Sequence, residues 1–513
     1  MITMTSALLR TERLYGNRPA IIDTEVHYTW KEHIARVRKL AGGLTKLGVA
    51  KGDRFGIIGP NSFRYTELIH AGYWAGAIPV PINHRLAPPE ILHILKDAEV
   101  KLLALGENYL NLTDDELLKP WENKRIVIGS SSPNTNVPAL DIITENGGSL
   151  DPHNPGENEL AILLYTGGTT GRSKGVQLTH RNVCSNGYQV INAMNIVKED
   201  IYLHVAPQFH AADLLGSGFT INGSAHAYVP VFSPKTVLQA IQDYKVTQAM
   251  MAPTMIIMIL EEPTFGDYDL SSYRNLFYGS SPMAAEWVEK AIQRFTKAGV
   301  QQGYGLTETS PILTTFDADD HAHAMETGNT DILRAAGRPL IGIDLKIFDE
   351  DDNELPTGQA GEVCVRGPNV TPGYLNRPEE NKEAFKNGWF HTGDVGKVDE
   401  NGILFLMDRK KDMIVSGGEN IYTSEVEAAL YKHPDVFECA VIGIPDYKYG
   451  EALLAVIVPM PDKNIEKDAI IKHCRKLIAG FKIPRQIDFV TELPKSAMSK
   501  ILKNELRKIY SKN

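Results

Sequence analysis

Apolar and polar residues alternate along the first 165 residues in a way that predicts strands and helices in turn. Thr29 and Glu32 form a capping box, in which each side chain can bind a backbone amide at the start of a helix. Apolar residues then recur at helical spacing until Gly48, a common helix stop. We expect a second helix at 63–75 and short buried strands at 54–58, 77–82, 100–105, 125–129 and 160–165. This alternation is typical of an α/β fold with mostly parallel sheets.

The pattern changes twice in the second half of the chain. Short strands separated by polar turns predict a small all-β, barrel-like segment, with strands at 344–348 and 361–366. A charged cluster at 409–412 precedes a compact αβ unit, which begins with a capping box of Ser424 and Glu427. Its other expected elements are strands at 436–442 and 453–458 and a helix at 465–478. We therefore predict a large N-terminal domain of layered α/β subdomains at 1–408 and a smaller C-terminal α+β domain at 409–513.

Composition excludes several classes of protein. The 53 basic and 63 acidic residues give a formal charge of −10, so the whole molecule has no electrostatic attraction to nucleic acid or to an anionic membrane. The four cysteines lie far apart, which indicates neither a disulfide framework nor a zinc site and fits a reducing compartment. The longest apolar run, 249–260, is shorter than the about 20 residues that cross a bilayer. We expect a cytoplasmic enzyme or binding protein without a secretory signal or a transmembrane segment.

The most informative local pattern is the glycine-rich stretch YTGGTTGRSKGV at 165–176, which follows an apolar strand. Glycines let backbone amides converge on an anion, hydroxyl groups can donate to phosphate oxygens, and a lysine adds positive charge. A phosphate-binding loop is therefore favoured over a flexible surface loop. The residues expected to form it are Thr166, Gly167, Gly168, Thr169, Thr170, Gly171, Ser173 and Lys174.

Two better-known phosphate motifs do not match. No glycine directly precedes Lys174, so the sequence has no GxxxxGK[ST] motif, and it has no GxGxxG motif. Residues 176–178 read as a second strand, and a helix is expected to begin near His180. The pattern therefore predicts strand–loop–strand, which differs from the strand–loop–helix of the P-loop and dinucleotide-binding sites.

The glycine-rich loop and several further motifs resemble those of a known superfamily. The loop is similar to the YTSGTTGxPKGV signature of the adenylate-forming enzymes, which include acyl-CoA synthetases, firefly luciferase and the adenylation domains of peptide synthetases. Further motifs match in order: GSSP at 279–282, QGYGLTET at 302–309, GWFHTGD at 388–394, DRKKD at 408–412 with GGEN at 417–420, and PKSAMSK at 494–500. The resemblance covers essentially the whole chain, and so many motifs in register make it specific.

The resemblance implies two half-reactions. A carboxylic acid reacts with ATP to give an acyl-adenylate and pyrophosphate, and a thiol, usually that of coenzyme A, then displaces AMP to form a thioester. Because the first step brings two anions together, it needs positive charge and Mg²⁺. Residues 204–213 resemble the fatty-acid-activating branch, so we expect a medium- or long-chain fatty acid as substrate. The alternatives are an aryl-acid (cinnamate or benzoate) ligase, an adenylation enzyme that loads a carrier protein, and a non-catalytic AMP-binding protein.

The resemblance also implies roles for residues around the nucleotide. Glu308 would bind Mg²⁺, Thr307 would hold a phosphate and Tyr304 would stack on adenine. Asp394 would accept hydrogen bonds from the ribose hydroxyls, the alternative being a plain turn residue, and Arg409 would approach the ribose or the phosphate. The residues expected to place backbone against the adenine and the acyl group are Gly279, Ser280, Ser281, Gly303 and Gly305.

Other implied roles belong to the C-terminal part of the chain and to the acyl pocket. Lys500 aligns with the catalytic lysine, which would bridge the substrate carboxylate and the α-phosphate. Lys411 aligns with a hinge on which the mobile C-terminal domain rotates, to present either Lys500 or the face of Gly417 and Gly418, which helps to form the pantetheine tunnel. His210 matches a position between the acyl pocket and the thiol entrance, with a purely structural role as the alternative. The neighbouring lysines expected at the surface are Lys495, Lys503 and Lys508.

Three residues depart from the family pattern: Gly167 replaces a common serine, Ser173 a common proline and Ser499 a common glycine. None of these changes removes a charge that the chemistry needs. The expected ligands are therefore ATP, Mg²⁺, coenzyme A and a carboxylic acid, with no nucleic acid partner, and a homodimer stays open.

Two remaining patterns are assigned to ordinary structure. The stretch at 319–323, DDHAH, lacks the helical spacing of a histidine metal site, and we expect a solvated loop there. The methionines expected together in one packed core helix are Met250, Met251, Met255 and Met258.

Overall fold

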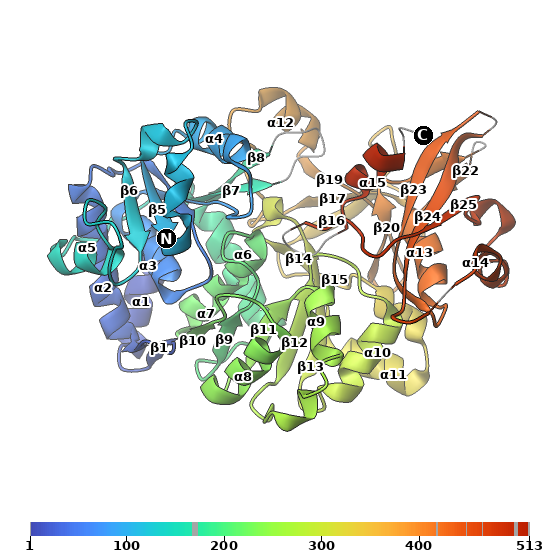
Figure 1. Cartoon of the computed structure of the whole chain (residues 1–513), viewed down its shortest axis with the longest axis horizontal. Coiled ribbons are helices and arrows are strands. Elements are labelled where there is room, and N and C mark those ends of the chain that lie inside the picture. The colour runs from blue at the N-terminus through green and yellow to red at the C-terminus, as the bar shows by residue number, and fades with distance from the viewer. Residues whose placement is uncertain are drawn as a thin grey trace.

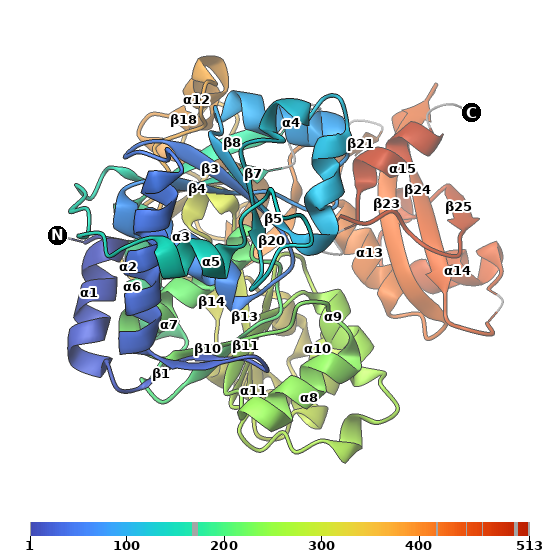
Figure 2. The same cartoon turned by 60° about the vertical axis from the view of Figure 1, so that its left-hand side comes forward.

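The molecule is described by a computed structural model that covers residues 2–166, 173–416, 419–447, 449–463, 465–496 and 501–510. The chain forms a large mixed α/β region and a smaller C-terminal unit, as the sequence predicts. Figures 1 and 2 place that unit, which carries α13, α14 and α15 and is drawn in orange and red, at one end of the molecule. No helix within the described ranges is both long enough and apolar enough to cross a membrane.

A parallel sheet with the order β4-β3-β5-β6 contains the first strands expected from the sequence. The capping box at Thr29 is confirmed: the Glu32 amide donates to the Thr29 hydroxyl at 3.3 Å, and the Thr29 amide donates to the Glu32 carboxylate at 2.8 Å. The next helix also keeps its predicted bounds, and its Trp74 is buried with Trp30 in one apolar core. The elements are α2 (Trp30–Lys46), β3 (Arg54–Ile58), α3 (Phe63–Ala75), β4 (Ile78–Pro81), α4 (Pro88–Asp97), β5 (Leu102–Gly106) and β6 (Arg125–Ile128).

The largest sheet has nine strands in the order β15-β14-β13-β12-β11-β9-β10-β1-β2. Its central pairings, from β1 to β13, are parallel, and the pairings at both edges are antiparallel. The carboxyl ends of the parallel strands therefore lie along one edge, where ligands of open α/β sheets bind. The strands are β1 (Pro19–Ile22), β2 (His27–Thr29), β9 (Ile201–His204), β10 (Ala225–Tyr228), β11 (Gln248–Met251), β12 (Asn275–Gly279), β13 (Gly299–Gly305), β14 (Ile312–Phe316) and β15 (Arg338–Pro339).

Helices cover both large sheets, and the lower helices of the nine-stranded sheet, drawn in green and yellow in Figure 1, are α8 to α11. Apolar residues of α8, α9 and α10 pack with β9, β11 and β12 in the largest core cluster. The helices not yet given are α1 (Met4–Tyr15), α5 (Leu140–Asn146), α6 (His180–Ala193), α7 (Gly216–Asn222), α8 (Pro234–Tyr244), α9 (Pro253–Leu260), α10 (Ala285–Arg294), α11 (Ala318–Thr327) and α12 (Pro378–Ala384).

Two antiparallel units complete the N-terminal region. The hairpin of β7 (Leu160–Thr166) and β8 (Lys174–Thr179) confirms the predicted strand–loop–strand arrangement, since α6 begins only at His180. The segment expected to be all-β forms a five-stranded antiparallel sheet. Its strands are β16 (Asp344–Phe348), β17 (Gly361–Arg366), β18 (Phe385–Lys386), β19 (Trp389–Val398) and β20 (Leu404–Arg409).

The C-terminal unit is built on one further sheet, in which β24 is central and β25 is its parallel neighbour. Its apolar core is separate from those of the N-terminal sheets. The boundary that the sequence places between residues 408 and 409 stays a prediction. The elements are β21 (Ile414–Ser416), β22 (Glu419–Ile421), α13 (Thr423–Tyr431), β23 (Val436–Asp446), β24 (Gly450–Pro459), α14 (Lys467–Cys474), β25 (Gln486–Phe489) and α15 (Lys503–Tyr510).

The predicted capping box of Ser424 and Glu427 is wrong. Helix α13 has Tyr422 at its N-cap and no capping hydrogen bond from a side chain. The Ser424 hydroxyl instead donates to the carbonyl of Met407. The Glu427 carboxylate forms an ion pair with the Lys503 ammonium at 2.8 Å. Both side chains therefore bond to residues that are distant in sequence and do not cap α13.

The predicted solvated loop at 319–323 is also wrong, because this stretch belongs to α11, which Asp317 caps. His321 is buried and accepts a hydrogen bond from the Tyr278 hydroxyl at 3.2 Å. Asp320 forms an ion pair with Arg338 at 2.6 Å. Among the residues with described positions, no group of three His, Cys, Asp or Glu side chains could hold a metal ion.

The four methionines do not share one core helix. Met250 and Met251 lie on β11, and Pro253 then starts α9, which carries the other two. Met258 is 51% exposed, so it faces solvent. Proline favours the first turn of a helix, which explains why the apolar run divides at this residue.

Candidate active site

The predicted phosphate loop closes the β7–β8 hairpin. Thr166 and Lys174 are paired in register at the ends of the two strands, so both face the loop. The connecting residues Gly167, Gly168, Thr169, Thr170 and Gly171 lie outside the described residues. The hairpin therefore fixes where the loop starts and ends.

Small residues mark the carboxyl ends of β12 and β13. Gly279 and Gly303 are register partners, and a Cβ atom on Gly279 would lie 2.5 Å from the Gly303 carbonyl oxygen. A Cβ atom on Gly305 would lie 1.9 Å from the Pro311 carbonyl oxygen. Ser280 follows Gly279 with a φ of 71°, in the left-handed region, and Ser281 continues the turn. These strand ends thus place bare backbone at the edge where the predicted adenine and acyl groups would lie.

Glu308 follows β13 in the short 3₁₀ helix η5 (Thr307–Thr309) and is 8% exposed. The hydroxyl of Tyr374 donates to its Oε1 at 2.8 Å. Burial raises the pKa of Glu308, and the Tyr374 hydrogen bond and the Arg409 charge oppose that rise without cancelling it. Thr307 is partly exposed beside it. The site therefore presents one buried carboxylate and one hydroxyl, an all-oxygen donor set.

Asp394, Tyr304 and Arg409 form a second buried cluster. Asp394 on β19 and Arg409 on β20 are register partners, and Arg409 Nε lies 3.1 Å from Asp394 Oδ1. The Tyr304 hydroxyl, from β13, donates to Asp394 Oδ2 at 2.8 Å. Burial raises the pKa of Tyr304. Burial lowers the pKa of Arg409, but Asp394 together with the weaker effects of Tyr304, Asp412 and Glu308 raises it overall.

These two clusters join sheets that are distant in sequence. The hydrogen bond from Tyr304 on β13 to Asp394 on β19 shows that the nine-stranded sheet and the five-stranded sheet meet at the site, and the charges of Asp394 and Arg409 both act on Glu308. The chain thereby brings together four residues that the motifs predicted, namely Tyr304, Glu308, Asp394 and Arg409. Asp394 lies within a strand, which excludes the alternative of a plain turn residue.

His210 comes from the same edge of the nine-stranded sheet but from another strand. It caps the 3₁₀ helix η3 (Ala211–Leu215), which follows the carboxyl end of β9, and its Nδ1 accepts from the Ala212 amide at 3.2 Å. In the same region, two buried side chains are hydrogen-bonded to each other: Asp213 Oδ1 lies 2.6 Å from His204 Nδ1. This local structural role is consistent with either alternative for His210.

The predicted hinge residue Lys411 is exposed and lies between two anchored aspartates. Asp408 accepts hydrogen bonds from the amide and the hydroxyl of Thr423, at 2.5 and 2.7 Å. Asp412 pairs with Arg507 at 2.8 Å. The predicted coenzyme A face and the predicted catalytic lysine, Gly417, Gly418 and Lys500, lie outside the described residues.

The expectation that Lys503 lies on the surface is wrong. Its side chain is 17% exposed and is held by Glu427 at 2.8 Å and by the hydroxyl of Thr423 at 2.5 Å. Burial lowers the pKa of Lys503, but Glu427 and Asp408 outweigh it, so that this pKa is raised. Lys508 is 68% exposed, as expected. Lys495 is partly exposed and pairs with Glu438 at 2.8 Å.

Tyr374 is a residue of the site that the sequence motifs do not predict. No motif links Tyr374 to Glu308. It lies in a polar stretch outside the predicted strands and helices, so hydrophobic periodicity does not predict that it is in the site. The only local hint is an aromatic residue directly after Gly373, because a buried aromatic ring beside a glycine often marks close packing. The structure places its ring 5.1 Å from the Lys174 ammonium, which joins Glu308 to the hairpin.

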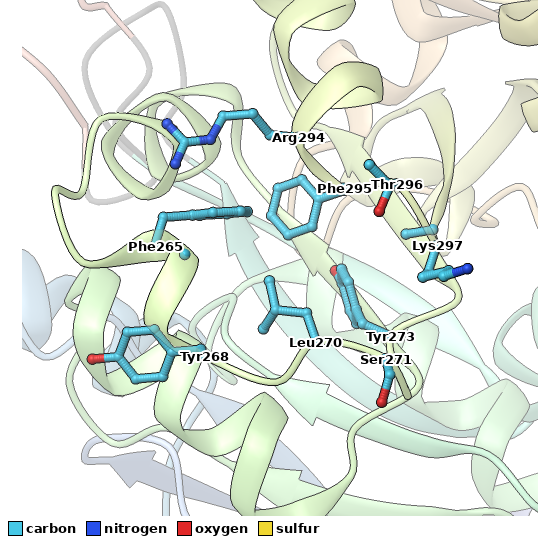
Figure 3. Close-up of a pocket in the computed structure, with 11 residues that line it drawn as sticks. Phe265, Tyr268, Leu270, Ser271, Tyr273, Arg294, Phe295, Thr296 and Lys297 are labelled. Atoms are coloured by element: carbon cyan, nitrogen blue, oxygen red, sulfur yellow. The ribbon is translucent and has the colours of Figure 1, made fainter.

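A surface pocket near α10 lies away from these residues (Figure 3). It has a volume of about 230 Å³ and is formed by residues next to η4 (Phe265–Asp267) and after α10. Figure 3 shows the rings of Phe265, Phe295 and Tyr273 around it. None of the residues predicted from the motifs lines this pocket.

Two family models match the chain. The AMP-binding enzyme model matches residues 9–375, and the AMP-binding enzyme C-terminal domain model matches residues 425–500. The chain belongs to the AMP-binding enzymes. Within that superfamily it falls in the acyl-CoA synthetase branch, as the motifs predict, and it is an AMP-forming acid–thiol ligase.

Curated relatives match this AMP-binding enzyme over nearly its whole length. It is 36% identical to a feruloyl-CoA synthase of Amycolatopsis sp, over 98% of each chain. It is 32% identical to a 2-succinylbenzoate–CoA ligase of Bacillus mycoides (strain KBAB4), over 99% of each chain. Among solved structures, the anthranilate CoA ligase AuaEII in complex with anthranoyl-AMP matches with a TM-score of 0.90 at 27% identity, over 99% of this chain and 97% of that one.

Proposed function

We propose that this enzyme activates an aromatic carboxylic acid with MgATP and transfers the acyl group to coenzyme A. The observation that carries the proposal is the meeting of Glu308, Asp394, Arg409 and Tyr304 beside the hairpin that ends in Thr166 and Lys174. A site of this kind offers hydrogen bonds and charge to a nucleotide from several fixed elements at once.

Two bonds change in each half-reaction. A carboxylate oxygen of the acid attacks the α-phosphorus of ATP, the bond to the β-phosphate oxygen breaks, and pyrophosphate leaves with that electron pair. The sulfur of coenzyme A, after losing its proton, then attacks the acyl carbonyl carbon, and AMP leaves with the oxygen that came from the acid. The first step is slow without help because two anions must approach each other.

We assign the nucleotide to the two buried clusters. Asp394 would accept hydrogen bonds from the ribose hydroxyls, Arg409 would hold that carboxylate in place and approach the phosphate, and the Tyr304 ring would lie against the adenine. Since the Tyr304 hydroxyl is already bound to Asp394, its ring orientation is fixed before the nucleotide arrives. The glycines at the ends of β12 and β13 pack so closely against neighbouring protein atoms that no side chain fits there. The residues assigned to the adenine and the acyl group at these strand ends are Gly279, Ser280, Ser281, Gly303 and Gly305.

The phosphates are assigned to the hairpin loop and to η5. Thr166, Lys174 and the loop between them would hold the β- and γ-phosphates, and Thr307 would donate a hydroxyl. Magnesium prefers oxygen ligands and takes one or two carboxylates together with phosphate oxygens, so the donor set of Glu308 and Thr307 fits it. When bound, this ion would offset negative charge on the phosphates.

The remaining assignments follow from the motifs. Lys500 would bridge the acid and the α-phosphate, and Lys411 would let the C-terminal domain, residues 409–513, rotate between the half-reactions. Gly417 and Gly418 would then contribute to the path of the thiol. His210 and Gly305 would border the acyl pocket.

The aromatic acid class replaces the fatty acid as our first choice. Feruloyl, 2-succinylbenzoyl and anthraniloyl groups all carry a ring near the carboxylate, and these names belong to relatives with full-length coverage. The same relatives name coenzyme A as the thiol, which supports coenzyme A over a carrier protein. A medium- or long-chain fatty acid stays the second candidate because of the segment at 204–213.

The test is pyrophosphate release from MgATP across a panel of acids: ferulate, 2-succinylbenzoate, anthranilate, benzoate, hexanoate and palmitate, each with and without coenzyme A. We expect the best aromatic acid to exceed both fatty acids in kcat/KM by at least about tenfold, the size of effect that one or two good pocket contacts produce. A preference for palmitate or hexanoate would overturn the acid class. Release without any dependence on acid would overturn acid activation, and acid-dependent release without a thioester would favour carrier loading.

A further inference from the structure

A short segment, residues 371–375, connects the phosphate-loop hairpin to the element that carries Glu308. On the hairpin side, the Leu375 amide donates to the Gly175 carbonyl at 2.8 Å, and the Gln177 amide donates to the Gly373 carbonyl at 3.1 Å. On the other side, the Thr371 amide donates to the Glu308 carbonyl at 2.8 Å. This segment therefore fixes the distance between two parts of the nucleotide site that are far apart in sequence.

The side chain of Tyr374 also connects the phosphate-loop hairpin to Glu308. Its hydroxyl donates to Glu308 Oε1 at 2.8 Å, and its ring lies 5.1 Å from the Lys174 ammonium. A carboxylate held by a buried donor loses rotational freedom, and a cation over an aromatic face is attracted to that face. One residue thus orients both the acidic and the basic group expected at the triphosphate.

The backbone of Tyr374 is itself held in place. The Asn381 amide side chain accepts from the Tyr374 amide at 2.7 Å and donates to the Tyr374 carbonyl at 2.9 Å. The preceding Gly373 has a φ of 144°, and a Cβ atom there would lie 2.8 Å from the Asn381 side chain. The position of Tyr374 is therefore determined by α12, which carries Asn381, as well as by the hairpin.

We propose that Tyr374 is a positioning residue of the nucleotide site, which sets the Glu308 carboxylate and the Lys174 ammonium for the magnesium-bound triphosphate. This inference rests on the proposed function, since it takes MgATP as the ligand. It predicts that removal of one oxygen atom, in Tyr374→Phe, weakens MgATP binding while it leaves binding of metal-free ATP nearly unchanged.

The matched control is Tyr165→Phe. The Tyr165 hydroxyl also donates to a carboxylate, Asp97 Oδ2, at 2.7 Å, and Tyr165 lies on the same hairpin. Its hydroxyl bonds to Asp97, which is not among the residues assigned to the nucleotide. The two variants therefore lose the same kind of hydrogen bond, and only one of these bonds involves Glu308.

The experiment is calorimetric titration of the full-length chain with ATP, in magnesium chloride and in EDTA. We expect Kd for MgATP to rise roughly tenfold in Tyr374→Phe, as for loss of a hydrogen bond to a charged group, and less than about twofold in Tyr165→Phe. In EDTA we expect both variants to remain within about twofold of the unchanged chain. Equal MgATP affinity in the two variants would overturn the role of Tyr374.

A double-mutant cycle separates positioning from a general structural effect. If Tyr374 acts through Glu308, adding Tyr374→Phe to Glu308→Gln should change Kd for MgATP by less than about twofold. Full additivity would contradict the proposal. Failure of the unchanged chain to bind MgATP would overturn the proposed function together with this inference, whereas normal binding with an unaltered Tyr374→Phe variant would overturn only the inference.

Discussion

At the scale of single residues, the candidate site is formed by charged side chains that are paired before any ligand binds. Both oxygens of Asp394 have partners, from Tyr304 and Arg409, and Glu308 has one from Tyr374. Such groups need little rearrangement when charge develops during a reaction, and preorganisation of this kind is a large part of catalysis. The site is thus organised by contacts within the chain, between residues of the nine-stranded sheet, the five-stranded sheet and the segment that carries Tyr374.

Lys500 is the residue whose assignment separates the two half-reactions most sharply. Lys500→Ala should lower the rate of acyl-adenylate formation by roughly 100-fold or more, because charge stabilisation between the carboxylate and the α-phosphate is lost. Conversion of supplied acyl-adenylate to acyl-CoA should change by less than about threefold, since that step does not need this charge. Both rates can be measured by rapid-quench chromatography.

The control for this lysine is Lys508→Ala, which removes an exposed lysine from the same end of the chain. It should leave both half-reactions unchanged. Equal losses in the two half-reactions of Lys500→Ala would refute the assigned role, and so would two unimpaired rates.

Residue identities in the site were largely predictable where they sit in motifs. Tyr304, Glu308, Asp394 and Arg409 could be named from local strings, although nothing in those strings shows that they meet. Tyr374 and Lys503 could not be found this way, because their importance comes from partners on other elements. A lone lysine in a polar stretch is usually solvated, and Lys503 differs because Glu427, Asp408 and Thr423 surround its ammonium.

At the scale of elements, prediction succeeded where the signal is local. The strand Arg54–Ile58 and the helix Phe63–Ala75 have the predicted bounds, and Thr29 caps α2 as expected. It failed where a tertiary partner competes, as for Ser424, whose hydroxyl bonds to Met407 instead of capping α13. Local periodicity contains no information about such partners.

Three buried histidines at the packing of α2, α3 and β10 make the N-terminal core sensitive to acid. His33 and His70 are joined at 2.9 Å between Nε2 and Nδ1, and His226 is joined to His204 at 2.9 Å. Burial lowers the pKa of His70 to about 3 and lowers the pKa values of His33 and His226 well below their usual range. All three are therefore neutral in the folded chain at pH 5.5, where unfolded histidines are mostly protonated.

The sign of the effect follows from proton binding. Below the unfolded pKa of about 6.5, the unfolded chain binds more protons than the folded one, so stability falls as the pH falls. Between pH 7.5 and 5.5 His70 alone should lower the free energy of unfolding by about 1.4 kcal/mol, and His33 and His226 should lower it further. Urea unfolding, followed by fluorescence of the buried Trp30 and Trp74, should therefore show a lower midpoint at pH 5.5.

The variant His70→Asn isolates one of these groups. It should reduce the difference in unfolding free energy between pH 7.5 and 5.5 by about 1.4 kcal/mol, whatever it does to stability at pH 7.5. An identical pH difference in the variant and the unchanged chain would show that His70 is protonated to the same extent in both states.

At the scale of the whole molecule, the C-terminal unit is tied to the five-stranded sheet beside the candidate site. Asp408, next to the last residue of β20, binds the start of α13 through Thr423, and the Ser424 hydroxyl donates to the neighbouring carbonyl of Met407. These bonds cross the predicted boundary at 408/409. Any rotation about Lys411 would have to break them, so they favour the arrangement seen in the structure.

The central claim is that an acid oxygen becomes bonded to the α-phosphorus and leaves with AMP. The most direct test uses the best acid of the panel with ¹⁸O in both carboxylate oxygens, followed by mass spectrometry of the products after turnover with MgATP and coenzyme A. We expect one ¹⁸O atom in AMP and one in the thioester carbonyl, with no label in pyrophosphate. Label in inorganic phosphate or pyrophosphate, or AMP without label, would contradict it.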